Sequence, residues 1–251
     1  MDFSILLTWD GVTYVAILCL LEIVLGIDNI IFISIISDRL PEEKQRTARN
    51  LGLSMALIAR LGLLAAVSWV MKMTAPLFTV FEVEITGQSI VLLAGGLFLI
   101  YKSTSEMHNA VAGKEEVKSK GKVTLSSVIT QIVLIDIVFS FDSIISAIGM
   151  TNDLGKETGK DPMIIIYIAV IISMIVMLLF AKQISNFISA HPTVKMLALS
   201  FLVAIGVILV AEAFGEHVPK GYLYFAFVYA LLVEALNIRM RKNKTKTKES
   251  E

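Results

Sequence analysis

Seven long apolar runs dominate the sequence and limit the folds open to it. A helix needs about 20 apolar residues to cross the roughly 30 Å hydrocarbon core of a bilayer, and each run approaches that length. The runs are continuous and do not alternate apolar with polar residues, as the strands of a membrane barrel do. The sequence therefore predicts an all-α polytopic membrane protein with seven transmembrane helices, over residues 12–36, 51–71, 85–101, 126–150, 163–181, 195–214 and 221–237.

Composition agrees with this class and excludes several functions. Hydrophobic residues make up 56% of the 251 residues and charged residues 18%, against roughly 45–50% and about 25% in soluble domains. The net charge of zero excludes a strongly basic nucleic-acid binder. A single cysteine, Cys19, excludes an internal disulfide framework and a multi-cysteine zinc or iron–sulfur site.

Lysine and arginine residues are distributed unevenly between the two sides of the membrane that seven spans would define. Most of the 22 Lys and Arg residues lie in the first, third and fifth connections and after residue 237. The positive-inside rule then places the N-terminus outside and the C-terminus in the cytoplasm. The expected location is the inner or plasma membrane of the cell. The sequence predicts a cytoplasmic linker over 111–123 and a flexible basic cytoplasmic tail over 238–251. The first run lacks a basic leader and a cleavage site, so we expect a membrane span rather than a signal peptide.

The two halves of the chain resemble each other. Glu22-Ile-Val-Leu-Gly-Ile-Asp28 aligns with Asp136-Ile-Val-Phe-Ser-Phe-Asp142 at a constant offset. A weaker match places Gly96 over Gly206 and Glu106 near Glu216. Three spans in each half would give the copies opposite orientations, the inverted repeat common in transporters. We expect repeats over about 10–110 and 124–218 and a seventh helix outside them.

Four acids inside apolar spans carry the functional prediction. A carboxylate at the bilayer centre costs about 2.5–3.5 kcal/mol on insertion scales, and Arg60, the one basic residue within a span, cannot balance four of them. A bound cation, protons or water must compensate. Oxygen ligands suit hard divalent ions such as Mg²⁺, Ca²⁺ and Mn²⁺, and the span interiors contain no histidine, which argues against zinc or copper. The predicted metal ligands are Glu22, Asp28, Asp136 and Asp142.

The spacing within each acid pair predicts a break in the helix. Residues six apart on an ideal helix point about 120° away from each other, so an unbroken helix would separate the two acids. Glycine, serine and asparagine at 26–29 and 140–143 favour interruption, and a broken helix brings both acids and freed carbonyls to one site. The alternative is an unbroken helix in which one acid pairs with Arg60 and the other extends toward water.

Other polar residues lie near the ends of spans. Glu106, His108, Glu216 and His217 are interfacial residues or, alternatively, part of an ion path. Glu212 and Glu234 are expected to pair with basic neighbours. The chain has no phosphate loop, nucleophile elbow or HExxH motif, and Leu-Gly-Ile-Asp28 lacks the glycine-rich context of an intramembrane aspartyl protease. We therefore expect no enzymatic activity and no resident cofactor.

The paired acid motifs resemble those of the TerC family of bacterial integral membrane proteins, named for tellurium resistance and grouped with LysE-type exporters. The resemblance covers about residues 5–237. It implies seven spans, an inverted repeat and export of manganese, and links some members to metal loading of secreted proteins near the secretion machinery. It also implies Asn29 and Ser143 as neutral helpers of the four acids.

These observations give a leading hypothesis and a rival. The first is a secondary exporter of divalent cations, with Mn²⁺ as the expected ion and proton binding to the same acids as the driving event. The rival is a membrane partner of secretion or assembly, or a tellurium-resistance-associated protein without transport activity. The bilayer is the expected partner in both, and a homo-oligomer is left open.

Overall fold

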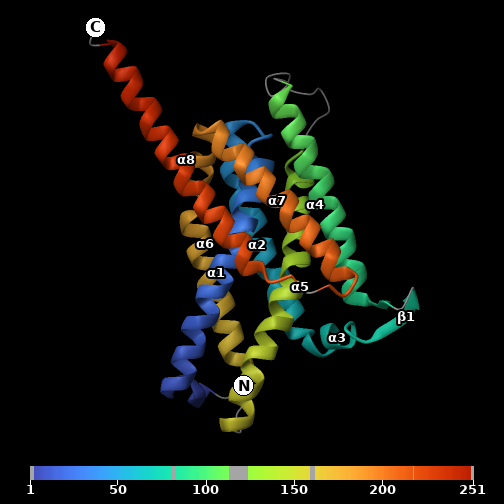
Figure 1. Cartoon of the computed structure of the whole chain (residues 1–251). Helices are drawn as coiled ribbons and strands as arrows, with labels where there is room; N and C mark the ends of the chain where they lie inside the picture. Colours follow the sequence, from blue (N-terminus) through green and yellow to red (C-terminus); the bar gives the residue numbers. More distant parts are fainter. Residues whose placement is uncertain (1–2, 81–82, 113–123, 159–161, 217, 250–251) are drawn as a thin grey trace.

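The computed structural model describes residues 3–80, 83–112, 124–158, 162–216 and 218–249. Within them, seven helices are long and apolar enough to cross a membrane, which confirms the predicted all-α polytopic fold. Figure 1 shows them as one bundle. They are α1 (Trp9–Ser37), α2 (Glu42–Ala65), α4 (Gly87–Val111), α5 (Leu125–Thr158), α6 (Met163–Ala190), α7 (Pro192–Ala213) and α8 (Lys220–Glu249).

Short elements connect the spans on one side of the bundle. A 3-10 helix, Phe3–Leu7, precedes α1, and the short helix α3 (Val67–Lys72) follows α2. An antiparallel hairpin of β1 (Pro76–Val80) and β2 (Val83–Thr86) then leads into α4. The apolar-run analysis does not predict this hairpin, which lies beside the first turn of α4 in Figure 1.

Local sequence fixes where the helices begin. The Thr8 hydroxyl accepts a hydrogen bond from the backbone N–H of Gly11 at the start of α1. At α4, Thr86 and Ser89 form a reciprocal capping box. Pro192 occupies the first turn of α7, where its missing N–H costs nothing. After α7, Gly215 adopts a left-handed φ of 87°, a conformation that suits glycine at a helix end.

Each helix of the first half packs mainly against one helix of the second. The principal pairs are α1 with α6, α2 with α5, and α4 with α7. An exchange of the two halves would preserve this set of pairs. That the two halves form an inverted repeat stays a prediction.

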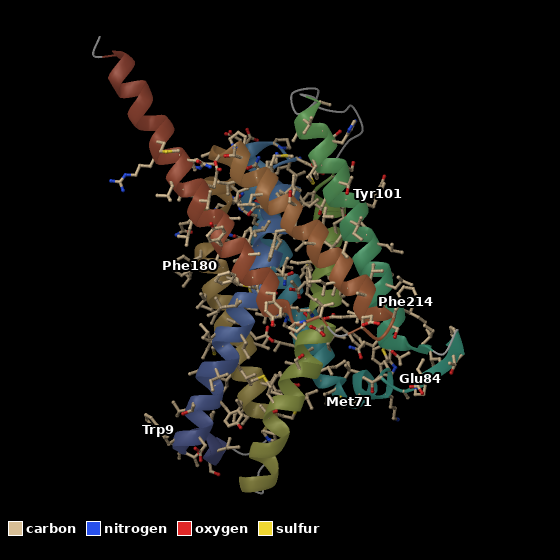
Figure 2. The ribbon with its side chains drawn as sticks, viewed as in Figure 1. Trp9, Met71, Glu84, Tyr101, Phe180 and Phe214 are labelled. Atoms are coloured by element: carbon tan, nitrogen blue, oxygen red, sulfur yellow. The ribbon has the colours of Figure 1, made fainter. Side chains whose placement is uncertain are left out.

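The outer surface of the bundle is apolar, as expected for a chain surrounded by lipid. Trp9, Tyr101 and Phe180 lie on the outside of the bundle (Figure 2). The helix α8 is the most peripheral, because only 6% of its apolar window is buried, compared with 33–50% for the others. It packs chiefly against α7.

The predicted helix interruptions are wrong. Both α1 and α5 run unbroken through residues 26–29 and 140–143. The Ser143 hydroxyl donates to the Ser140 carbonyl inside the helix, and a Cβ added at Gly26 would collide with the sulfur of Met177. These small residues therefore serve packing and local hydrogen bonding, whereas a gap in the backbone ladder would leave polar groups unsatisfied in the membrane.

Several predicted boundaries also differ: α2 begins at Glu42 and ends at Ala65, and α6 ends at Ala190. The helix α8 continues to Glu249, so residues 238–249 extend a helix rather than form a flexible tail. Lysine, arginine and glutamate are good helix formers, which explains the continuation. The third span reaches Val111, ten residues beyond its apolar run. Of the predicted linker 111–123, Val111 is the last residue of α4 and Ala112 its C-cap, and residues 113–123 lie outside the described residues.

A close backbone contact between α4 and α7 leads to a test of packing. A Cβ added at Gly96 would lie 2.7 Å from the Gly206 carbonyl oxygen, whereas one added at Gly62 would meet nothing within 4 Å. We expect Gly96→Ala to lower the free energy of unfolding by about 1–3 kcal/mol, the usual cost of overpacking. Gly62→Ala is the matched control, since it should be neutral or stabilising by up to about 1 kcal/mol. Thermal unfolding in detergent measures both, and equal midpoints would contradict the tight crossing.

Candidate functional site

A buried arginine joins three helices at the centre of the bundle. Arg60 of α2 is 2% exposed. Its Nη1 lies 2.5 Å from Glu22 Oε2 of α1, and its Nη2 lies 3.1 Å from Asp136 Oδ1 of α5. The first acids of the two repeated motifs, Glu22 and Asp136, therefore both form ion pairs with one guanidinium.

Neutral side chains complete this Arg60 cluster, which consists of Glu22, Asn29, Arg60, Asp136 and Ser140. Arg60 Nε donates to the Ser140 hydroxyl at 2.8 Å, and that hydroxyl is 3.2 Å from Asp136 Oδ2. Asn29 Nδ2 donates to Asp136 Oδ1 at 2.9 Å. Asn29 Oδ1 is buried and has no hydrogen-bond partner among the described residues.

The charges of the Arg60 cluster do not cancel. Two buried carboxylates share one guanidinium, so the cluster carries one excess negative charge when both acids are ionised. Burying an unpaired charge is costly. The cluster is therefore a place where a proton or a cation would be stabilising.

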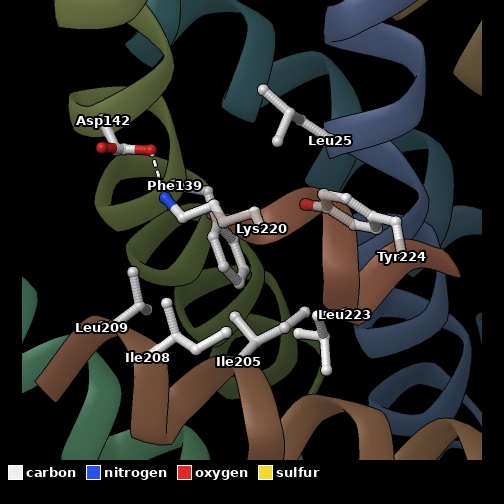
Figure 3. Close-up of a pocket in the computed structure, with 9 residues that line it drawn as sticks. All are labelled: Leu25, Phe139, Asp142, Ile205, Ile208, Leu209, Lys220, Leu223 and Tyr224. Carbon is white, nitrogen blue, oxygen red and sulfur yellow. Dashed lines mark hydrogen bonds and ion pairs between the residues drawn. The ribbon is translucent and has the colours of Figure 1, made fainter. Parts of the chain in front are cut away.

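Asp142 lies apart from this cluster, in a second charged group. Lys220, the first residue of α8, forms an ion pair with Asp142 of α5 (Figure 3). Lys220 Nζ also lies 3.2 Å from Glu212 Oε2 at the end of α7. The expectation that Glu212 pairs with a basic neighbour is confirmed. One ammonium is thus held between carboxylates of two helices.

A cavity of about 690 Å³ opens beside this group. It lies between the hairpin, the start of α4, α5 and the α7–α8 connection, and Figure 2 shows Glu84 of the hairpin and Phe214 after α7 on this side of the molecule. We call it the acidic vestibule, because four carboxylates line it together with Lys220: Glu84, Asp142, Glu212 and Glu216.

A second, smaller cavity of about 20 Å³ touches the same ion pair. Its walls are mostly apolar and include Leu25, Phe139 and Tyr224, with Asp142 and Lys220 as charged members (Figure 3). This volume has room for about one water molecule. Asp142 and Lys220 therefore line both cavities.

At the opposite end of α4, Glu106 does not approach Glu216. Glu106 forms an ion pair with Arg39 of the α1–α2 connection. Burial lowers the pKa of the Arg39 guanidinium, although an arginine stays charged at physiological pH. The Arg39–Glu106 pair connects the α1–α2 connection to α4 at the end of the bundle away from the hairpin (Figure 1).

The predicted ligands therefore separate into groups. Glu22, Asn29 and Asp136 meet at Arg60, and Asp142 meets Lys220. Ser143 is buried and bonds within its own helix. The side chain of Asp28 and all of His217 lie outside the described residues. Among the described residues, no three Asp, Glu, His or Cys side chains are arranged to hold a metal ion.

The comparisons with known proteins bear on the family of this chain. A sequence profile of the "Integral membrane protein TerC family" matches residues 7–249. The chain belongs to the TerC family. No solved structure matches it.

Relatives of this TerC-family chain include a UPF0053 protein of Haemophilus influenzae, 50% identical over 227 residues, which span 90% of this chain and 92% of the relative. The UPF0053 inner membrane protein YgdQ of Escherichia coli K12 is 47% identical over 227 residues, which again span 90% of this chain and 92% of the relative. YoaE of the same strain is 46% identical over 245 residues, but this chain spans 44% of its length. Seven apolar helices and these names support a multi-pass inner-membrane protein.

Sequence reasoning on this TerC-family chain missed Lys220 and Ser140 as partners of the acids. Lys220 precedes the seventh apolar run, so hydropathy alone places it outside the membrane-spanning residues. A basic residue at a span boundary after Glu212 was the available signal. Ser140 follows Asp136 by one helical turn, the spacing at which side chains meet on a helix.

Removing the guanidinium of the Arg60 cluster should destabilise the chain. We expect Arg60→Met to lower the free energy of unfolding by about 3–5 kcal/mol, since breaking a buried ion pair leaves uncompensated charge. Thermal unfolding in detergent gives the measurement. The triple variant Arg60→Met with Glu22→Gln and Asp136→Asn should recover much of the loss, because no charge is then left buried.

An unchanged unfolding midpoint for Arg60→Met would show that the ion pairs are not part of the folded protein. A triple variant as unstable as Arg60→Met would assign the loss to packing of the arginine side chain instead.

Proposed function

We propose that this chain is a membrane transporter for hard divalent cations and that Mn²⁺ is its substrate. The observation that carries the proposal is the acidic vestibule. It is lined by Asp142 and Glu212, the two carboxylates that form ion pairs with Lys220. The family resemblance supplies the choice of Mn²⁺. The side chains at the vestibule supply oxygen ligands, which hard cations prefer.

The charge pattern suits a path for cations. Clefts lined by one sign of charge with low-dielectric walls raise the local concentration of the opposite ion. Four carboxylates and one ammonium leave the vestibule with excess negative charge. The buried Arg60 cluster carries a further excess negative charge when both of its acids are ionised. A divalent ion is therefore attracted first to the rim and then toward the interior.

The distribution of basic residues supports a direction. The vestibule lies on the side of the hairpin and of the α7–α8 connection, which the positive-inside rule assigns to the outside. In export, the ion would leave through the vestibule. The Arg39–Glu106 pair lies toward the opposite end, which the same rule assigns to the cytoplasm, so in this proposal the conformation with the open vestibule is the outward-facing one.

Transport by the purified chain tests this proposal. In proteoliposomes with a Mn²⁺-sensitive dye inside, the wild-type chain should carry Mn²⁺ down its gradient faster than protein-free vesicles. Asp142→Asn should lower the initial rate at least about tenfold, which corresponds to about 1.4 kcal/mol of lost stabilisation along the path. Asp10→Asn is the matched control, since Asp10 is an exposed acid at the start of α1 on the same side.

A wild-type rate equal to that of protein-free vesicles would overturn the proposal. A normal rate for Asp142→Asn would remove the vestibule from the path. If Asp142→Asn abolished transport but cells carrying it still secreted and assembled membrane proteins normally, the rival role in secretion would lose its link to this site.

A further inference from the structure

We propose that Lys220 is a tethered cation which occupies the ion-binding position of the vestibule and has to be displaced by the divalent substrate. This inference rests on the proposed transport function and adds a residue to it. Lys220 then sets the affinity of the site as a built-in competitor.

The first step is the geometry of the ammonium. Lys220 is held by Asp142 of α5 and by Glu212 of α7, at 3.2 Å from Glu212 Oε2. The side chains of Asp142, Lys220 and Glu212 are 25%, 22% and 11% exposed. All three line the vestibule, so the ammonium lies between two carboxylates at its wall and within reach of an incoming ion.

The second step is the charge balance. A lysine ammonium is a compact point charge with hydrogen-bond donors and no acceptor. It occupies the same carboxylate oxygens that a divalent cation would bind. Two carboxylates and one ammonium leave one negative charge, whereas the same carboxylates with a divalent ion are neutral. An arriving divalent ion would also repel the ammonium.

The third step is the space available to the displaced side chain. Lysine has a flexible four-carbon stem, and the vestibule beside Lys220 measures about 690 Å³. Glu216 and Glu84 are exposed carboxylates at the same cavity and offer the ammonium a second position. Gly221, which follows Lys220, has open space around it.

A purely structural role of Lys220 predicts a different result. The helix α8 is little buried and packs chiefly against α7, so the ion pair of Lys220 could simply hold the start of α8 in place. In that case neutralising Lys220 would loosen α8 and disturb the two carboxylates. Affinity for divalent ions would stay the same or fall, because no competitor would have been removed.

Equilibrium binding of Mn²⁺ to the purified full chain in detergent separates these roles. Free Mn²⁺ is followed by its electron paramagnetic resonance signal. We expect Lys220→Gln to bind Mn²⁺ about tenfold more tightly than the wild type, since removing a competing charge from two carboxylates strengthens their attraction for the ion. Lys72→Gln is the matched control, because Lys72 is an exposed lysine on the hairpin side of the bundle and should leave the affinity unchanged.

A chemical rescue tests the same idea on one folded preparation. In Lys220→Cys with Cys19→Ala, modification by 2-aminoethyl methanethiosulfonate restores an ammonium at this position, whereas methyl methanethiosulfonate leaves it neutral. The neutral product should bind Mn²⁺ about tenfold more tightly than the ammonium product. This comparison holds even if Lys220→Gln folds poorly.

The outcomes distinguish this inference from the proposed function. Wild-type binding that needs Asp142, together with equal or weaker binding by Lys220→Gln and by the neutral product, would overturn the role of Lys220 alone. Absence of both Mn²⁺ binding and Mn²⁺ flux in the wild type would overturn the proposed function. Tighter binding by the neutral forms and unchanged binding by Lys72→Gln would support the inference.

Discussion

The interaction on which the rest of the structure depends is the guanidinium of Arg60 shared by Glu22 and Asp136. These acids come from different halves of the chain, and a third helix supplies the arginine. A buried ion pair contributes little net stability, because desolvation of the two charges offsets much of their attraction. Removal of one partner nevertheless lowers stability strongly, because it leaves the other charge buried and unpaired. The cluster therefore fixes the relative positions of α1, α2 and α5 and leaves one excess negative charge at the centre of the bundle.

A second ionic group repeats this arrangement nearer the surface. Lys220 lies between Asp142 and Glu212 and again leaves one excess negative charge. The two groups differ in their access to water. Arg60 is enclosed, whereas Lys220 lines a cavity of about 690 Å³. An internal cation can be exchanged for an external one only where water reaches it, and this is why the proposed function assigns the first binding of an ion to the vestibule group.

The sequence predicted the number and type of spans well, because continuous apolar runs near 20 residues have few other folds open to them. It also identified the acids, since charge inside apolar runs is conspicuous. Its alternative of an unbroken helix with an acid paired to Arg60 is the arrangement that the structure has, but the partner of Asp142 was missed. The helix α1 is continuous at 26–29, and Gly26 lies there against Met177, a tertiary contact that local propensity does not show. The ion pair of Lys220 was missed because hydropathy does not show that a residue before an apolar run reaches Asp142, which is distant in sequence.

The crossing of α4 and α7 has a mechanical consequence. At Gly96 and Gly206 the two backbones approach closely, because a Cβ at either glycine would lie within 3 Å of the carbonyl oxygen of the other. Interlocked side chains must change rotamer when helices turn against each other, but bare peptide surfaces need not. The glycine contact would therefore give α4 and α7 a point about which to pivot with few rotamer changes. Such a pivot would widen one end of the pair as it narrows the other.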